Sequence, residues 1–419
     1  MIWRALYSLL WRLATPLVRR YLRRRGKKTP AYLEYWDERF GRALNAKHQG
    51  AIWVHAVSVG ETRAAMPLIQ ALQQQWPGVP LLITQMTPTG RACAEALYGE
   101  QAEIRYLPYD YPQGVHAFLQ AYRPRFGVLM ETELWPNLIA AAHEQSIPLF
   151  LANARLSEKS YRGYRRFAAL IRPALRQLTA VAAQSKDDAE RLAALGASDP
   201  QVCGNTKYDF TPPPAQALLG AEFKQRLGDR PIVVCASTRD GEEALILQAW
   251  RAHRPQALLV IVPRHPERFD EVAQLALANG FTLQRRSDQQ PVLPETQVWL
   301  GDSMGEMFAY YHAADLVFIG GSLMPLGGQN LIEPASIGRP VLIGPSCFNF
   351  AEASQIAFEC GAACQVSDSD RLVDLINQLL VDAPRRVAMG QAGLAFSKAH
   401  RGASQRIVEL IASRLSIHE

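Results

Sequence analysis

Short, continuously apolar runs alternate with longer segments of helical periodicity along most of the chain. A run that is apolar at nearly every position indicates a strand buried on both faces, as in a parallel sheet covered by helices. In the first half, the predicted strands are 51–59, 79–86, 103–110, 125–133, 147–155 and 178–185. In the second half, they are 231–238, 257–264, 281–286, 298–302, 316–322 and 340–345.

The alternation is interrupted at residues 204–216, which include three consecutive prolines. Because proline lacks an amide hydrogen and fixes its backbone, such a run does not continue a helix or a central strand. We therefore predict two Rossmann-like, doubly wound α/β domains, 29–210 and 211–419, with the last helix able to pack back on the first domain. Domains of this type bind ligands at the carboxyl ends of their strands, so we expect a cleft where the two sheets face each other.

The first 28 residues form a separate segment, 1–28, that carries a charge of +9, so the rest of this +6 chain carries −3. Residues 1–18 are apolar at helical spacing, but Arg4 and Arg12 interrupt the run. An aromatic-rich amphipathic helix followed by a basic cluster is typical of an anchor lying on an anionic cytoplasmic membrane surface. A short span of the bilayer and a helix packed on the protein's own body are the alternatives.

The mildly acidic body argues against a protein that wraps nucleic acid. The one stretch that interleaves aromatic and basic residues, 161–167, fits either lipid phosphates or a solvated helix face. The six cysteines form no C-x-x-C pair and no zinc-finger spacing with histidines, which predicts scattered buried thiols in a reducing compartment.

Acids follow two predicted strands of the first half. Glu61 comes after a Ser-Val-Gly turn and opens a predicted helix, 61–75, where the helix dipole alone would also favour an acid. Glu131 and Glu133 are two residues apart at the end of strand 125–133, so we expect both side chains to point the same way. Lys207, near the domain boundary, is a cation for the same region or a solvated side chain.

Nucleotide-binding candidates follow the predicted strands of the second half. Strand 257–264 ends in Pro263 and Arg264, and an arginine there can meet an anion or a nucleobase edge. The turn at 301–307 opens a helix that runs to Ala314, and three amides at its start can bind a phosphate, namely those of Met304, Gly305 and Glu306.

A glycine-rich loop precedes a second predicted helix in this half. Gly327 and Gly328 free the backbone at the helix N-terminus, which suits a phosphate. Asn330 and Glu333 are three residues apart and so share a helix face, where a carboxylate suits a ribose diol.

Together these segments resemble the Kdo transferase family (3-deoxy-D-manno-octulosonic acid transferases) over essentially the whole chain. The matching motifs, in order, are HAVSVGE, METELWPN, NARLSEKS, GNTKYD, VPRHPERF, GDSMGEM and GGSLMPLGGQNLIEPA. The resemblance implies a GT-B glycosyltransferase that needs no metal or other cofactor. It implies inverting transfer of Kdo from CMP-Kdo to the tetraacyl lipid A precursor, lipid IVA, in lipopolysaccharide biosynthesis. The place implied is the cytoplasmic face of a Gram-negative inner membrane.

The resemblance also implies roles by motif position. Glu61 is the expected general base, and Glu131 and Lys207 are the expected transition-state stabilisers. The expected CMP site comprises Pro263, Arg264, Met304, Gly305, Glu306, Asn330, Leu331, Ile332 and Glu333. Gln329 departs from the histidine that family members often have, and glutamine cannot titrate.

Two other functions fit part of this pattern. A GT-B lipid glycosyltransferase that uses a UDP-sugar would need a uracil-reading pocket. A membrane-tethered binding protein with a degenerate cleft would lack the acids at strand ends, whereas Glu61, Glu131 and Glu333 are all present.

Overall fold

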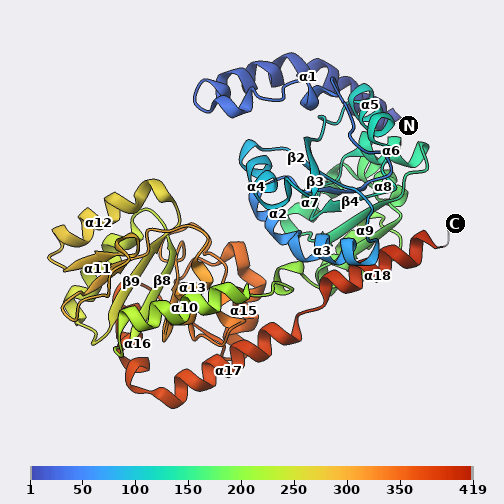
Figure 1. The fold of residues 1–419 in the computed structure, drawn as a ribbon. Helices are drawn as coiled ribbons and strands as arrows, with labels where there is room; N and C mark the ends of the chain where they lie inside the picture. The colour runs from blue at the N-terminus through green and yellow to red at the C-terminus, as the bar shows by residue number, and fades with distance from the viewer. Residues whose placement is uncertain (1, 417–419) are drawn as a thin grey trace. The chain divides into compact units, whose positions relative to one another are not determined.

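The computed structural model describes residues 2–416. They form two compact units, one made of residues 2–209 and 401–416 and the other of residues 210–400. Each unit contains one seven-stranded parallel sheet (Figure 1). The chain passes between the units beside the predicted boundary, and it returns to the first unit with its last helix, α18 (Ala403–Leu415).

The sheet of the first unit has the order β3-β2-β1-β4-β5-β6-β7. Its strands are β1 (Ile52–His55), β2 (Leu81–Gln85), β3 (Ala102–Tyr106), β4 (Phe126–Met130), β5 (Leu149–Ala154), β6 (Ala180–Ala183) and β7 (Gln201–Val202). In the central register, Ile52 pairs with Leu81 on one side and with Phe126 on the other. The observed strands are shorter than predicted because the apolar runs continue into the loops at their ends.

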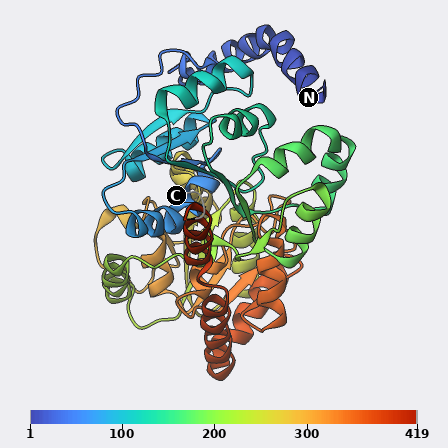
Figure 2. The ribbon, with the colours of Figure 1, turned by 90° about the vertical axis from the view of Figure 1, so that its right-hand side faces the viewer.

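Helices cover both faces of this sheet. They are α2 (Val59–Ala64), α3 (Met66–Gln75), α4 (Pro88–Tyr98), α5 (Pro112–Tyr122), α6 (Pro136–Glu144), α7 (Glu158–Arg166), α8 (Ala168–Gln177) and α9 (Lys186–Leu195). One core packs Trp53 and Leu129 against α5, α6, α8 and α9. The other packs Val54 and Val128 against α3, α4 and α18, and α18 lies along α3 (Figures 1 and 2). The predicted helix 61–75 is two helices, since α2 ends at Ala64 and α3 begins at Met66 with Pro67 in its first turn.

The sheet of the second unit has the order β10-β11-β9-β8-β12-β13-β14. Its strands are β8 (Ile232–Thr238), β9 (Leu258–Pro263), β10 (Leu283–Arg285), β11 (Val298–Leu300), β12 (Leu316–Ile319), β13 (Val341–Ile343) and β14 (Ala363–Gln365). Its helices are α10 (Pro214–Leu227), α11 (Glu242–His253), α12 (Phe269–Ala278), α13 (Met307–Ala313), α14 (Ile332–Ala335), α15 (Ala351–Glu359), α16 (Ser369–Val381) and α17 (Ala383–Ala399). The strand β14 is absent from the sequence prediction.

Helix α1 (Ile2–Gly26) packs on α6 and α8 of the first unit (Figure 1). The ring of Trp11 stacks on that of Tyr109, with centroids 5.7 Å apart. Its outer face exposes a stripe of leucines at helical spacing, namely Leu6, Leu9, Leu10, Leu13 and Leu17. Within residues 2–416, no helix combines the length and the apolar character needed to cross a bilayer.

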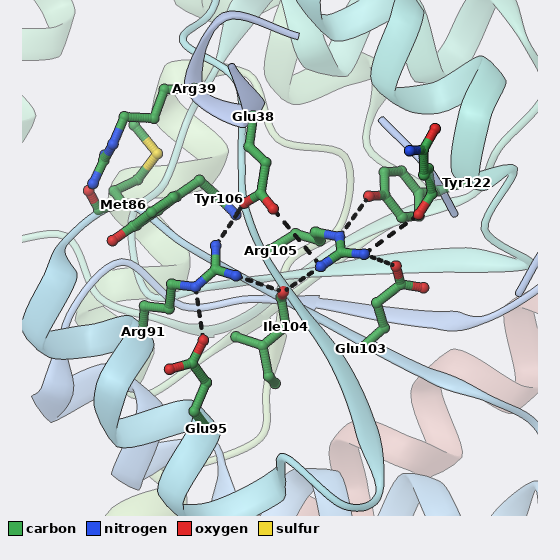
Figure 3. A network of polar contacts seen from close by, with 11 residues as sticks. Glu38, Arg39, Met86, Arg91, Glu95, Glu103, Ile104, Arg105, Tyr106 and Tyr122 are labelled. Atoms are coloured by element: carbon green, nitrogen blue, oxygen red, sulfur yellow. Dashed lines mark hydrogen bonds and ion pairs between the residues drawn. The ribbon is translucent and has the colours of Figure 1, made fainter. Parts of the chain in front are cut away.

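A buried ionic network joins the segment after α1 to the first sheet (Figure 3). Glu38, in the short helix η2 (Glu38–Phe40), accepts from Arg91 Nη1 at 2.6 Å and from the Tyr106 amide at 2.9 Å. Arg105 in turn contacts Glu103 at 2.8 Å. Glu38 therefore has Arg91 beside it and Glu103 has Arg105, as the burial of charge in a low-dielectric interior requires.

Candidate functional site

The loop between β1 and α2 holds the carboxylate of Glu61 in a fixed position. Ser58 caps α2, and its hydroxyl accepts a hydrogen bond from the Glu61 amide at 3.4 Å. The Glu61 carboxylate accepts from the Val57 amide at 2.8 Å and from the Ser58 hydroxyl at 3.0 Å. Glu61 therefore lies in the first turn of the helix, where the helix dipole favours an acid, and it also presents a half-buried carboxylate at the carboxyl edge of the sheet.

The chain after β4 does not continue as the predicted strand. β4 ends at Met130, and Glu131 has a φ of +56°, in the left-handed region. The expectation that Glu131 and Glu133 point the same way by strand alternation was therefore wrong. The turn nevertheless keeps both acids near the end of β1, because the negative charges of Glu61 and Glu131 both act on the Glu133 carboxyl.

Lys207 approaches this cluster of acids from beyond the edge strand β7, at the same carboxyl edge of the sheet. It lies in the short helix η3 (Thr206–Tyr208), after β7, and its Nζ lies 3.7 Å from Glu131 Oε1. The side chain of Asn205 accepts from the Lys207 amide at 3.0 Å, and Asn153 accepts from the Thr206 amide at 3.1 Å. These bonds dock η3 at the carboxyl edge, where Lys207 meets the acids.

The electrostatics of this cluster favour a base that works near neutral pH. Burial raises the pKa of Glu61 to about 7, and the charge of Glu131 raises it too. The Val57 amide, the Ser58 hydroxyl and Lys207 oppose this effect. Burial likewise raises the pKa of Glu133 to about 7. A carboxylate with a pKa near the working pH takes up a proton more effectively than an ordinary one.

A second group of candidates lies in the second unit, around Arg264. This residue follows β9, and its amide donates to the Thr238 carbonyl at 3.0 Å. Burial raises the pKa of Tyr311, as do the charge of Glu333 and a hydrogen bond to it, while the charge of Arg264 lowers that pKa. Arg264, Tyr311 and Glu333 therefore lie together. The sequence missed Tyr311, because a tyrosine within the helix FAYYHA has the pattern of a core residue.

Asn330 does not share a helix with Glu333. Helix α14 begins at Ile332, so Asn330 precedes it and that prediction was wrong. The Asn330 side chain accepts from the Ile332 amide at 3.0 Å and donates to Glu333 Oε1 at 3.1 Å. Asn330 thus binds the first amide of the short helix and orients the carboxylate of Glu333. Leu331 and Ile332 are buried, backbone included.

The turn before α13 has a defined geometry. Gly305 has a φ of +78°, and its carbonyl accepts from the Gln216 side chain at 3.1 Å. Glu306 is bound at 3.1 Å by each of two Arg286 nitrogens, and the Ser303 hydroxyl donates to it at 2.6 Å. Met304 is half-exposed beside them. Side chains therefore hold the turn at Gly305 and Glu306, while Met304 and Gly305 are exposed.

The backbone amides of Gly327 and Gly328 both donate hydrogen bonds to other parts of the protein. The Gly327 amide donates to the Ser346 hydroxyl at 2.9 Å, and the Gly328 amide donates to the Gly321 carbonyl at 2.7 Å. Gly328 also lies four residues before α14. The expectation that these glycines free their amides at the helix N-terminus was therefore wrong. Their positive φ values, +87° and +71°, explain why glycine occupies both positions.

The described residues contain no group of three or more histidine, cysteine, aspartate or glutamate side chains placed to hold a metal ion.

Comparisons with known proteins place the chain in one family. Residues 34–210 match the family described as 3-Deoxy-D-manno-octulosonic-acid transferase (kdotransferase). A 3-deoxy-D-manno-octulosonic acid transferase of Bordetella pertussis is 42% identical, over 97% of this chain and 98% of its own. One from Haemophilus influenzae is 38% identical, over 98% of both chains.

A solved glycosyltransferase from Rickettsia africae has the same fold. It is 12% identical, with a TM-score of 0.59, and the match covers 89% of this chain and 100% of that one. The two doubly wound units agree with this GT-B architecture. With the near-full-length relatives, these findings show that the chain is a glycosyltransferase that belongs to the 3-deoxy-D-manno-octulosonic acid transferase family.

Proposed function

We propose that this protein transfers Kdo from CMP-Kdo to a tetraacyl disaccharide lipid A precursor, with inversion, in lipopolysaccharide biosynthesis. The family supports the transferred sugar. The observation that carries the chemistry is the half-buried Glu61 carboxylate, held by Val57 and Ser58, with a pKa near 7 and with the pair of Glu131 and Lys207 beside it.

Each residue of this cluster has a role in the proposed transfer. The acceptor hydroxyl attacks the anomeric carbon of Kdo, the bond from that carbon to the phosphate oxygen breaks, and CMP leaves with the electron pair. Glu61 takes the hydroxyl proton as the new bond forms. The sugar becomes positively charged at its anomeric carbon while it keeps its negative carboxylate. Glu131 and Lys207 supply opposite charges for these two centres.

The second unit supplies the groups that suit a nucleotide. Arg264 suits a phosphate or a base edge, and Glu333, oriented by Asn330, suits a ribose diol. The backbone of the turn at Met304, Gly305 and Glu306 suits the phosphate. We propose that these groups and the backbone at 330–333 bind CMP, and that the enzyme needs no metal or other cofactor.

Helix α1 supports a location at the cytoplasmic face of an inner membrane. Its leucine stripe faces outward, with Leu13 67% and Leu17 68% exposed. Its last turn carries Arg23, Arg24 and Arg25. An exposed apolar face and a basic end are the features of a helix that lies on anionic lipid.

Flotation of the protein with anionic vesicles, and not with neutral ones, would support this location. Equal flotation of a Leu13→Asp, Leu17→Asp variant would contradict it.

The transfer is tested by incubating the protein with CMP-Kdo and the tetraacyl lipid A precursor and reading the product mass. A mass increase of one or more Kdo residues is expected, with and without a metal chelator. Competition by CMP and not by UDP would distinguish this donor from a UDP-sugar. A product that carries no Kdo would overturn the proposal.

A further inference from the structure

Arg239 lies next to the proposed nucleotide site and is not one of the residues proposed to bind CMP. It follows β8, and β8 pairs with β9, whose end carries Arg264. The register places Thr238 opposite Pro263, and the Arg264 amide bonds to the Thr238 carbonyl. Adjacent strands are about 4.8 Å apart. Two arginines therefore leave the same sheet edge side by side.

Two glycines after β12, Gly320 and Gly321, let the backbone lie close to the end of β8 and to Arg239. A Cβ atom on Gly320 would lie 2.6 Å from the Ser237 carbonyl oxygen, which is too close for any side chain. One on Gly321 would lie 3.2 Å from the Gln329 side-chain nitrogen and 3.4 Å from Arg239 Cγ. The side chains of Arg239 and Gln329 therefore both lie against Gly321, where the missing Cβ lets them come close to the backbone and to each other.

The buried carboxylate of Glu242 binds both the backbone of Arg239 and the loop after β12. Glu242 is fully buried at the start of α11 and accepts from the Arg239 amide at 2.9 Å. It also accepts from the amides of Ser322 and Leu323 at 2.9 Å each. The backbone of Arg239 is thus fixed against the loop that follows Gly321. Because this backbone is already fixed, binding a ligand here costs little conformational entropy.

The local charge is positive. Burial lowers the pKa of the His265 imidazole, and the positive charges of Arg239, Arg264 and Arg268 lower it further, while the one negative charge that acts on it, Glu267, raises it. The acids next to Arg239 in sequence have other partners. Asp240 lies 3.6 Å from Arg268, and Glu242 accepts backbone amides. The region therefore favours an anionic ligand.

We propose that Arg239, with the side-chain amide of Gln329, binds the carboxylate of the acidic sugar in the donor. This inference rests on the proposed function, which assigns the nucleotide to the group around Arg264. A CMP-linked sugar acid carries two anions, a phosphodiester and a carboxylate, on the same anomeric carbon. Two guanidinium groups from adjacent strands match two anions that close together, and the planar arginine fork suits a carboxylate.

The test separates the sugar acid from the nucleotide. Arg239→Gln should lower kcat/KM for CMP-Kdo about 10- to 100-fold, the range for a lost charged hydrogen bond. Inhibition by CMP, which lacks the carboxylate, should change less than about twofold, and Arg239→Lys should recover part of the loss. Arg264→Gln should instead weaken CMP inhibition. Arg385→Gln, at an exposed position of α17, is the matched control.

Two results would overturn the assignment while the proposed function stands. One is an Arg239→Gln variant with unchanged kcat/KM for CMP-Kdo. The other is a parallel loss of CMP inhibition, which would place Arg239 at the nucleotide. CMP inhibition also reports that the variant is folded. A wild-type protein that transfers no Kdo and binds no CMP would overturn the proposed function itself, and the carboxylate site with it.

Discussion

Lys207 and Glu131 meet across the carboxyl edge of the first sheet, with Nζ 3.7 Å from Oε1. They follow β7 and β4, which are separated in the sheet by β5 and β6. Both side chains are about a quarter to a third exposed, at 26% and 30%. A pair this exposed contributes little to stability, typically less than about 1 kcal/mol. Their convergence beside Glu61 therefore supports the roles proposed above for this pair.

Replacing either member of this pair should slow transfer without unfolding the protein. We expect Lys207→Met and Glu131→Gln each to lower kcat/KM about 100-fold, a typical loss for a charge aimed at the transition state. Because the two act together, the double variant should lose much less than the product of the single losses. Lys224→Met, which breaks an exposed pair with Asp315, is the control. Fully multiplicative losses would show that the residues act independently.

Glu61→Gln should bind CMP-Kdo normally and transfer almost nothing. The amide keeps the shape of the side chain but cannot take up the acceptor proton, and a general base contributes about 100- to 10,000-fold. Donor binding is measured by titration and transfer by single-turnover kinetics. Glu158→Gln, an exposed acid in the first turn of α7, is the control. Near-normal turnover of Glu61→Gln would exclude this residue as the base.

The fold follows closely from local pattern, because each buried strand is a short apolar run. Predictions fail where a single residue overrides the pattern. Pro67 divides the helix predicted over 61–75, and the left-handed Glu131 ends β4 early. The strands β7 and β14 escaped prediction because neither Gln201–Val202 nor Ala363–Gln365 lies in a continuous run of large apolar residues.

The site was less predictable than the fold, since its contacts join distant parts of the chain. The sequence showed that Glu61 follows a strand, but it did not show the hydrogen bonds that its carboxylate accepts from Val57 and Ser58. Lys207 gained its significance only from Glu131, 76 positions earlier in the numbering. Nothing in the local sequence indicates that Glu242 holds the amides of Ser322 and Leu323.

The pH dependence of transfer should follow the ionisation of Glu61. The base must be ionised, and its pKa is raised to about 7, so activity should fall as the pH falls through about 7. Glu133 protonates over the same range, so the acid limb belongs to both groups. The measurement is kcat/KM from pH 5 to 9. An acid limb below pH 5 would contradict the raised pKa.

Two variants should move this acid limb in opposite directions. Glu131→Gln removes a negative charge that raises the pKa of Glu61, so the limb should move to lower pH. Lys207→Met removes a positive charge that lowers that pKa, so the limb should move to higher pH. The residual activity of each variant is sufficient for the profile, and Glu158→Gln should show no shift. Shifts of the same sign would exclude this electrostatic account.

Glu242→Ala should loosen the loop after β12 and destabilise the protein. The carboxylate is fully buried and accepts the amides of Arg239, Ser322 and Leu323, which would lose their acceptor. An unsatisfied buried amide costs about 1–3 kcal/mol, so the loss should be about 3 kcal/mol or more. Urea unfolding gives the stability, and hydrogen exchange in residues 316–331 reports the loop. Glu359→Gln, at an exposed position of α15, is the control. Unchanged exchange in that segment, with stability within about 0.5 kcal/mol of wild type, would show that Glu242 does not hold the loop.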